Sequence, residues 1–292
     1  MLVMEEEQIR KNVREGYAKI VKEGLCCSSS TPCSGSSAKY EEMGKKMGYT
    51  AKELQSIPEG ANLGLGCGNP VALASLKEGE TVVDLGSGGG VDCFLAAKNV
   101  GKNGKVIGVD MTPEMIYKAR ENARRGNYEN VEFRLGEIEN LPVGDNTADV
   151  VISNCVINLA PNKRRVFKEI FRALKPGGRL MVSDIVLLRE LPEEVRKGAH
   201  AASCIKGAIL KDKYIETIEQ TGFENVMILK ETRYSFEEII NDPDARVIVA
   251  DKRKNTEQMK KVSELEREAR EIVANTLTAT TSIHVSAIKP SK

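Results

Sequence analysis

The sequence predicts an α/β fold built on a mostly parallel sheet. Short apolar segments alternate with segments of helical periodicity between residues 81 and 184, as is typical of a sheet covered by helices on both faces. A glycine-rich loop directly follows the first apolar segment, and Asp110 ends the second. Strand, glycine loop and helix in this order are typical of sheets that bind nucleotides at the carboxyl ends of their strands.

The first 58 residues are predicted to form a helical segment interrupted by a loop. Apolar residues at helical spacing in 9–24 predict a helix that ends at Gly24. The small polar residues of 26–37 cannot pack a core and therefore predict a loop. Its cysteines are Cys26, Cys27 and Cys33. A short helix with its boundary near Gly48 is expected next.

Residues 59–230 are predicted to form the core domain. Its first five strands are expected at 81–85, 105–110, 131–135, 149–153 and 179–184. Thr112, Pro113 and Gly126 are placed as the N-cap, first turn and end of one intervening helix. A second helix is expected over 163–174, stopped by Lys-Pro-Gly-Gly at 175–178.

The remaining chain gives weaker signals, and we expect 231–292 to form a smaller C-terminal region. Segments 211–222 and 256–275 are predicted as helices, the second being a charged insertion before the last strand. Three further segments are predicted as strands, at 223–230, 246–250 and 280–288. The last of these alternates apolar with polar residues, as a strand with one buried face would.

The composition excludes several functional classes. Lys and Arg number 43 against 42 Asp and Glu, so a net charge of +1 gives no field that would gather nucleic acid. No run approaches the roughly 18 apolar residues that span a bilayer, and the acidic N-terminus has no secretory signal. We therefore expect a cytoplasmic protein with neither nucleic-acid nor membrane partners. With only His200 and His284, few histidines are available as a general base.

The glycine loop at 84–90 (Asp-Leu-Gly-Ser-Gly-Gly-Gly) predicts an adenosine ligand. Its glycines allow a sharp turn and the close approach of a ligand to the backbone. Asp110 lies 24 residues after Gly86, where a carboxylate can accept ribose hydroxyls. A dinucleotide fingerprint would need glycine at Val91, although a nicotinamide site and a purely structural loop stay open.

Three of the seven cysteines are expected to meet at the carboxyl edge of the sheet. Cys67 lies in the glycine-rich loop 64–70, Cys155 two residues after a strand, and Cys204 after the connection from the fifth strand. Their spacing matches no zinc finger and suits a soft ion with few ligands. Cys93, on the helix after the glycine loop, is interpreted as core packing.

These motifs together resemble a known family. The Gly-x-Gly-x-Gly spacing preceded by Asp84 resembles the S-adenosylmethionine loop of Rossmann-like methyltransferases, and residues 175–178 resemble another landmark of that superfamily. With the segments 64–70 and 153–159 and Cys204, the sequence resembles the microbial arsenite S-adenosylmethionine methyltransferases. The resemblance runs from about residue 9 to 230 and includes the last strand.

The resemblance implies a class I methyltransferase sheet, expected to have seven strands, and a role in arsenic detoxification. It implies that Cys67, Cys155 and Cys204 bind trivalent arsenic as the catalytic residues, with arsenite and methylarsenite as substrates. It also implies S-adenosylmethionine as methyl donor and an external thiol reductant, either glutathione or thioredoxin. One cysteine of the 26–37 loop would then help to reduce the oxidised product.

The adenosine pocket is expected to be formed by residues from four loops. These are Asp84, Gly86, Gly88, Gly90, Asp110, Met111, Glu137, Ile138 and Asn154. Two other functions stay open at this point. The chain could methylate a small organic acceptor, such as a quinone precursor, or it could bind metalloids without catalysis.

Overall fold

The computed structural model describes residues 2–23, 36–191, 204–233 and 279–292. Its sheet has seven strands in the order β3-β2-β1-β4-β5-β7-β6. Strand β7 runs antiparallel to β5 and β6, and the other neighbouring strands pair in parallel. The strands are β1 (Thr81–Leu85), β2 (Lys105–Asp110), β3 (Val131–Leu135), β4 (Ala148–Asn154), β5 (Leu174–Leu187), β6 (Glu224–Thr232) and β7 (Thr280–Ile288). The predicted α/β class and the seven mostly parallel strands are confirmed.

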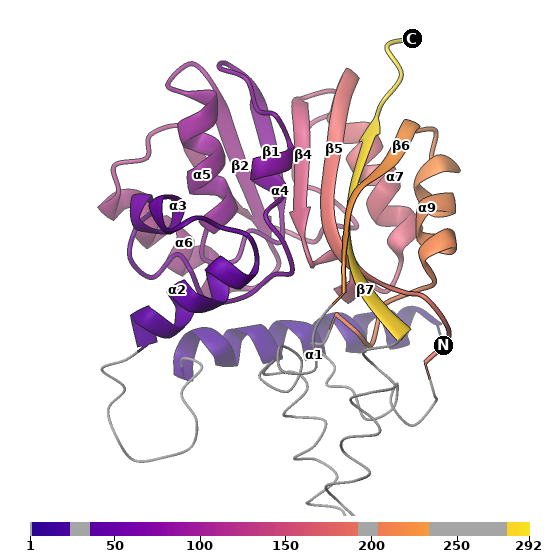
Figure 1. Cartoon of the computed structure of the whole chain (residues 1–292), viewed down its shortest axis with the longest axis horizontal. Coiled ribbons are helices and arrows are strands. Elements are labelled where there is room, and N and C mark those ends of the chain that lie inside the picture. Colours follow the sequence, from indigo (N-terminus) through magenta and orange to yellow (C-terminus); the bar gives the residue numbers. More distant parts are fainter. Residues whose placement is uncertain (1, 24–35, 192–203, 234–278) are drawn as a thin grey trace, which may run out of the picture.

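Helices cover both faces of this sheet (Figure 1). The hydrophobic core has two parts, one on each face of the sheet, because successive residues of β1 point to opposite faces. Val83 and Leu85 pack with α7 and α9, whereas Val82 packs with α4, α5 and α6. The helical elements are α1 (Leu2–Glu23), α2 (Ser36–Lys46), α3 (Ala51–Ser56), α4 (Pro70–Leu73), α5 (Val91–Val100), α6 (Pro113–Arg125), a 3-10 turn (Ile157–Leu159), α7 (Lys163–Ala173) and α9 (Lys211–Glu219).

The last strand, β7, lies inside the sheet, between β5 and β6, and places Ser183 opposite His284. Its apolar residues are buried as predicted, but its polar residues Thr281 and Ser282 are buried as well. The alternation predicted only one covered face. It could not predict that the loop around Cys67 and Gly68 covers the second face, which carries Ser282 and His284.

Strand β5 begins earlier than predicted. The residues expected only to stop the preceding helix, 175–178, form its first part. Gly177 N donates a hydrogen bond to Lys289 O, and Lys289 N donates to Gly178 O. This segment therefore pairs with the chain just beyond β7, more than 100 residues away, and local sequence carries no signal of that pairing.

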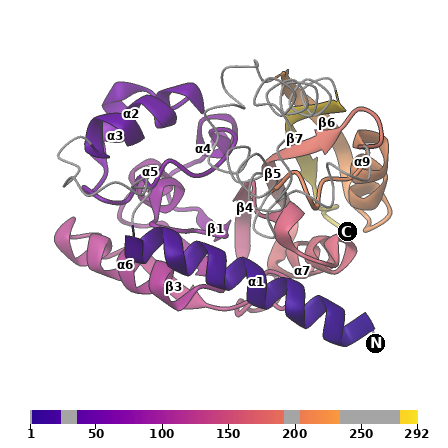
Figure 2. The same ribbon diagram turned by 90° about the horizontal axis from the view of Figure 1, so that it is seen from below.

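Helix α1 crosses the edge of the sheet at which the parallel strands end (Figures 1 and 2). It begins at Leu2, earlier than predicted, and ends at Glu23, one residue before the predicted Gly24. Two of the contacts that hold it there lie at its middle and at its end. Val13 is 1% exposed and packs beside Cys155, which follows β4. Lys22 Nζ lies 2.7 Å from Glu114 Oε1, at the start of α6.

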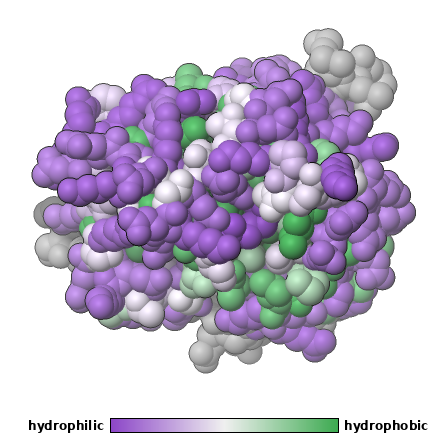
Figure 3. Space-filling view, turned by 90° about the horizontal axis from the view of Figure 1, so that it is seen from above, coloured by the Kyte–Doolittle hydropathy of each residue, from purple (hydrophilic) through white to green (hydrophobic). Residues whose placement is uncertain are grey.

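Several expectations fall outside the described residues. These are Cys26, Cys27, Cys33 and His200, the strand at 246–250 and the helix at 256–275. In the part that is described, no helix combines the length and apolar character needed to cross a bilayer. The surface seen from above, on the side away from α1, is mainly hydrophilic with small hydrophobic patches (Figure 3).

Candidate active site

Cys155 occupies a strained position directly after β4. Its φ is +60°, a left-handed conformation that costs free energy in a residue with a side chain. The backbone N–H of Cys155 donates a 2.7 Å hydrogen bond to Ser183 O on β5 and so holds this turn. Strain of this kind persists where the surroundings fix it, and it is common at functional sites.

The structure brings Cys67, Cys155 and Cys204 together. Cys155 and Cys204 are buried in one cluster, against which the half-buried Cys67 packs. The Cys204 thiol donates a 2.8 Å hydrogen bond to Cys155 O. Hydrogen bonds from Cys155 to Cys204 and Cys67, together with burial, raise the pKa of the Cys155 thiol well above its usual range. Three thiols from distant chain segments therefore share one site.

The loop that carries Cys67 is held by the side chain of Asn154, at the end of β4. Asn154 Oδ1 accepts a 2.9 Å hydrogen bond from Cys67 N, and Asn154 Nδ2 donates a 2.7 Å bond to Gly68 O. Ser282 Oγ on β7 donates to Cys67 O at 3.1 Å. Both sides of the Cys67 backbone are thereby tied to the sheet.

Gly68 lets this loop lie directly on β5 and β7. A Cβ at position 68 would stand 2.4 Å from His284 Cε1 and 2.7 Å from Ser183 Oγ, closer than side-chain atoms approach one another. Beneath it, Ser183 Oγ and His284 Nδ1 lie 2.6 Å apart. The glycine is therefore needed for close approach of the loop.

Asp184 joins the thiols, although the sequence did not single it out. Sγ of Cys67, Sγ of Cys155 and a carboxylate oxygen of Asp184 all lie within 4.8 Å of one another. Burial raises the pKa of Asp184 to about 7, against hydrogen bonds that lower it. Asp184 ends the strand predicted at 179–184, so its place at the carboxyl edge was the available signal.

The glycine loop and Asp110 form a second, adjoining part of the site. Gly88 N donates to Asp110 Oδ2 at 3.0 Å, and Thr112 N donates to Asp110 Oδ1 at 2.8 Å. Each carboxylate oxygen keeps a lone pair that could accept a ribose hydroxyl. A Cβ at position 88 would meet nothing within 4 Å, so the backbone borders open space there. The arrangement fits an adenosine ligand.

The other loop glycines face protein. A Cβ on Gly86 would stand 2.4 Å from Val156 Cγ2, which places the loop directly against the residue after Cys155. Gly90 lies at the start of α5 with φ +99°, where a Cβ would strike Phe94. Gly90 therefore serves the packing of helix on sheet, as the last glycine of such loops commonly does.

Two buried acids lie behind the glycine loop. Burial and the charge of Asp92 raise the pKa of Asp84 well above its usual range, and burial raises the pKa of Asp92 to about 6. Tyr49 Oη donates to Asp92 Oδ1 at 2.7 Å, and the Cys93 thiol donates to Asp84 Oδ2 at 3.2 Å. Cys93 is wholly buried, in line with its interpretation as core packing.

The residues expected around adenine lie near α1. Met111 packs against the cysteine cluster, and Ile138 packs against the core. Arg10 of α1 reaches this region, with its Nε 3.7 Å from Glu137 Oε2 and its Nη1 3.1 Å from Glu139 Oε2. Sequence reasoning missed Arg10, because nothing local indicates where an N-terminal helix docks.

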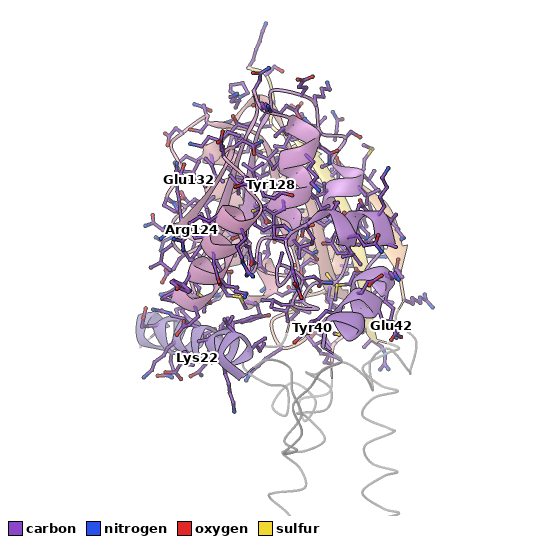
Figure 4. The ribbon with its side chains drawn as sticks, turned by 90° about the vertical axis from the view of Figure 1, so that its left-hand side faces the viewer. Lys22, Tyr40, Glu42, Arg124, Tyr128 and Glu132 are labelled. Atoms are coloured by element: carbon purple, nitrogen blue, oxygen red, sulfur yellow. The ribbon has the colours of Figure 1, made fainter. Side chains whose placement is uncertain are left out.

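A groove between α6 and β3 lies away from these groups. Tyr117, Arg124, Tyr128 and Phe133 are among the residues that line it. Figure 4 labels Arg124 and Tyr128 high on this side of the molecule and Lys22 below them on α1. Three strand spacings separate β3 from β4, roughly 14 Å. The groove is therefore separate from the thiols.

Comparison with known proteins agrees with this arrangement. Residues 76–222 match a family described as a methyltransferase domain. The chain is 32% identical to an arsenic(III) S-adenosylmethionine methyltransferase from Chlamydomonas reinhardtii, with a TM-score of 0.59 over 85% of this chain and 73% of that one. The chain belongs to the arsenite S-adenosylmethionine methyltransferase family.

Other relatives in this family span several kingdoms. An arsenite methyltransferase of Halobacterium salinarum is 48% identical over 82% of this chain, and that of Homo sapiens is 31% identical over 76%. The matched part covers only 63% and 60% of their lengths. The chain thus spans about three fifths of the length of these two arsenite methyltransferases.

Proposed function

We propose that the chain transfers a methyl group from S-adenosylmethionine to trivalent arsenic held by Cys67, Cys155 and Cys204. The products would be methylated arsenicals, and the physiological role would be arsenic detoxification. The observation that carries the proposal is the meeting of these three thiols beside the glycine loop. Membership of the family gives the reaction class independent support.

The glycine loop supports the donor half of the proposal. The open backbone at Gly88 and the carboxylate of Asp110 would hold the adenosine, with Met111, Glu137 and Ile138 near the adenine. Asp84 lies buried behind the glycine loop, Asn154 holds the backbone of Cys67, and both would border the methionine end. S-adenosylmethionine supplies an electrophilic methyl group on a sulfonium.

The thiols would both bind and activate the metalloid. Arsenite, As(OH)₃, exchanges its three hydroxyls for three thiolates, and each thiol proton leaves with a hydroxyl as water. The bound arsenic keeps a lone pair, so no base is needed to generate the nucleophile. The protein's task is then alignment of the arsenic with the methyl carbon, an effect that can supply about 7–11 kcal/mol of barrier reduction.

Methyl transfer oxidises arsenic formally from the trivalent to the pentavalent state, so each further cycle needs two electrons. We propose an external thiol, glutathione or thioredoxin, as their source, with Cys26, Cys27 or Cys33 as the relay. Both donors belong to the reducing cytoplasm, which is where we place the reaction.

Purified protein incubated with S-adenosylmethionine, arsenite and glutathione should produce methylated arsenic, measured by arsenic speciation. The Cys155→Ser variant should lose at least about 100-fold in this activity, because it removes one of the three ligands. Binding of S-adenosylmethionine by that variant, measured by calorimetry, should remain within about threefold of the wild type.

Full arsenic methylation by Cys155→Ser would contradict the proposal. Methylation of an organic acceptor by variants with serine at all three positions would indicate the alternative enzyme. Arsenite binding without any turnover of the methyl donor would indicate a metalloid-binding protein instead.

A further inference from the structure

The side chain of Asp184 is fixed more firmly than packing alone requires. Asn158 Nδ2 donates to Asp184 Oδ1 at 2.8 Å, and Ile185 N donates to the same oxygen at 2.9 Å. Tyr214 Oη donates to Oδ2 at 3.1 Å. Buried carboxylates that ligate metals are oriented in this way by hydrogen bonds from a surrounding shell.

The carboxylate is held against two thiols. Its ligand atom and the sulfurs of Cys67 and Cys155 lie within 4.8 Å of one another, which is close to the spacing of ligands around a single ion. Asp184 and Cys155 are buried and Cys67 is half-buried, so an ion would be largely shielded from water but could enter on the Cys67 side. Since each carboxylate oxygen has two lone pairs, Oδ2 can ligate while it accepts the Tyr214 bond.

Trivalent arsenic has no need of this carboxylate. Three thiolates complete its pyramidal coordination, and the third is supplied by Cys204. A divalent ion such as Zn²⁺ differs, because it takes four ligands and combines sulfur with carboxylate oxygen in one tetrahedral site. The two thiols and the carboxylate supply three of those ligands and leave one position open.

We propose that Cys67, Cys155 and Asp184 form a site for a divalent thiophilic cation of the Zn²⁺ class, which competes with trivalent arsenic for two of its thiols. On binding, M²⁺ replaces the two thiol protons, which pass to solvent, and no electrons are transferred. The cation site and the arsenic site then share Cys67 and Cys155 but differ in the third ligand. The competition rests on the proposed function, whereas the cation site itself does not.

The test is a pair of titrations on the full chain, reduced and freed of metal. Zn²⁺ affinity is measured against a chromophoric chelator, and arsenite affinity is measured by calorimetry. Asp184→Asn should weaken Zn²⁺ binding at least about tenfold and change arsenite binding less than about threefold. Cys204→Ser should do the reverse, and Cys155→Ser should weaken both.

Asp149→Asn is the matched control, because Asp149 lies at the opposite end of β4, paired with Lys175. It should leave both affinities unchanged. Co²⁺ bound to the wild type gives a readout that needs no variant at Asp184. The intensity of its thiolate charge-transfer band should correspond to two sulfur ligands, and Cys204→Ser should leave that intensity unchanged.

Three results would overturn the inference. These are an unchanged Zn²⁺ affinity in Asp184→Asn, a Co²⁺ spectrum with three thiolate ligands, and the absence of Zn²⁺ binding by the wild type. Zn²⁺ that binds through Asp184 without raising the apparent dissociation constant for arsenite would overturn the competition. If arsenite is neither bound nor methylated while Zn²⁺ still depends on Asp184, the cation site stands and the proposed function fails. The two ideas can therefore be separated.

Discussion

Asn154 links the end of β4 to the loop that carries Cys67. Its amide group also lies within hydrogen-bond distance of Tyr49 Oη, at 3.0 Å, and of Asp92 Oδ2, at 3.2 Å. One side chain therefore joins the thiol loop to the acids behind the glycine loop. The sequence predicted Asn154 as a pocket residue, but its partners in the loop are 86 and 87 positions away.

Asn154→Ala should lower the free energy of unfolding by about 2 kcal/mol, because it leaves buried backbone groups without partners. It should also weaken arsenite binding, since Cys67 loses its position. Urea denaturation and arsenite calorimetry measure the two effects. Asn99→Ala, an exposed position on α5, is the control. Unchanged stability and arsenite affinity in Asn154→Ala would contradict this account.

His284 makes the stability of the molecule depend on pH. Burial and the charge of Lys230 lower the pKa of His284 to about 4, compared with about 6.5 in an unfolded chain. Between these values the unfolded state takes up a proton that the native state does not. Acidification through this range therefore favours unfolding.

His284→Gln removes this titration. Between pH 7.5 and pH 5, the wild type should lose about 2 kcal/mol more of its unfolding free energy than the variant. Urea denaturation at both values measures the difference. Parallel pH profiles for the two proteins would show that His284 does not titrate as described.

Helix α1 is the element that closes the site. Val13 and Tyr17 pack at the cysteine cluster, while Arg10 pairs with Glu137 and Glu139. Glu139 is 4% exposed and also accepts a hydrogen bond from Asn162 N. The helical periodicity of α1 was predicted from local sequence. Its docking was not, because contacts 129 positions apart leave no local pattern.

Arg10→Ala should loosen α1, because it removes the cationic partner of a buried carboxylate. Loss of such a charged hydrogen bond costs about 2 kcal/mol, so hydrogen exchange within residues 2–23 should accelerate about 30-fold. Exchange measured by mass spectrometry tests this. Lys11→Ala, an exposed position on the same helix, should leave the exchange unchanged. Equal exchange in the two variants would mean that Arg10 does not hold the helix.

The positions of the strands were easier to predict than the partners with which each strand pairs. The strands β1, β2 and β3 lie where the sequence placed them, at 81–85, 105–110 and 131–135. β5 extends five residues before its predicted start at 179 and three beyond its predicted end at 184, and its first extension includes Lys-Pro-Gly-Gly, which has no apolar run. It does so because β4 and β7 hydrogen-bond along its two edges. Long-range pairing of this kind sets strand length but is invisible to a short sequence window.

The whole molecule assembles its site from segments that the chain separates widely. Cys155 follows a parallel strand, so the carboxyl-edge rule was sufficient to predict its place. The same expectation for Cys67 and Cys204 depended less directly on this rule, because neither directly follows a strand. Asp184 was missed for a different reason. Its position at a strand end was visible, but the direction of its side chain depends on Asn158 and Tyr214, which belong to other elements.

The proposed reaction depends on the claim that three thiols from separate parts of the chain bind one arsenic atom. X-ray absorption at the arsenic edge, recorded on the protein with one equivalent of arsenite, measures the ligands directly. We expect three sulfur neighbours in the wild type, and two sulfurs with one oxygen in Cys204→Ser. A wild-type spectrum with two sulfurs or fewer, or a Cys204→Ser spectrum identical to it, would contradict the claim.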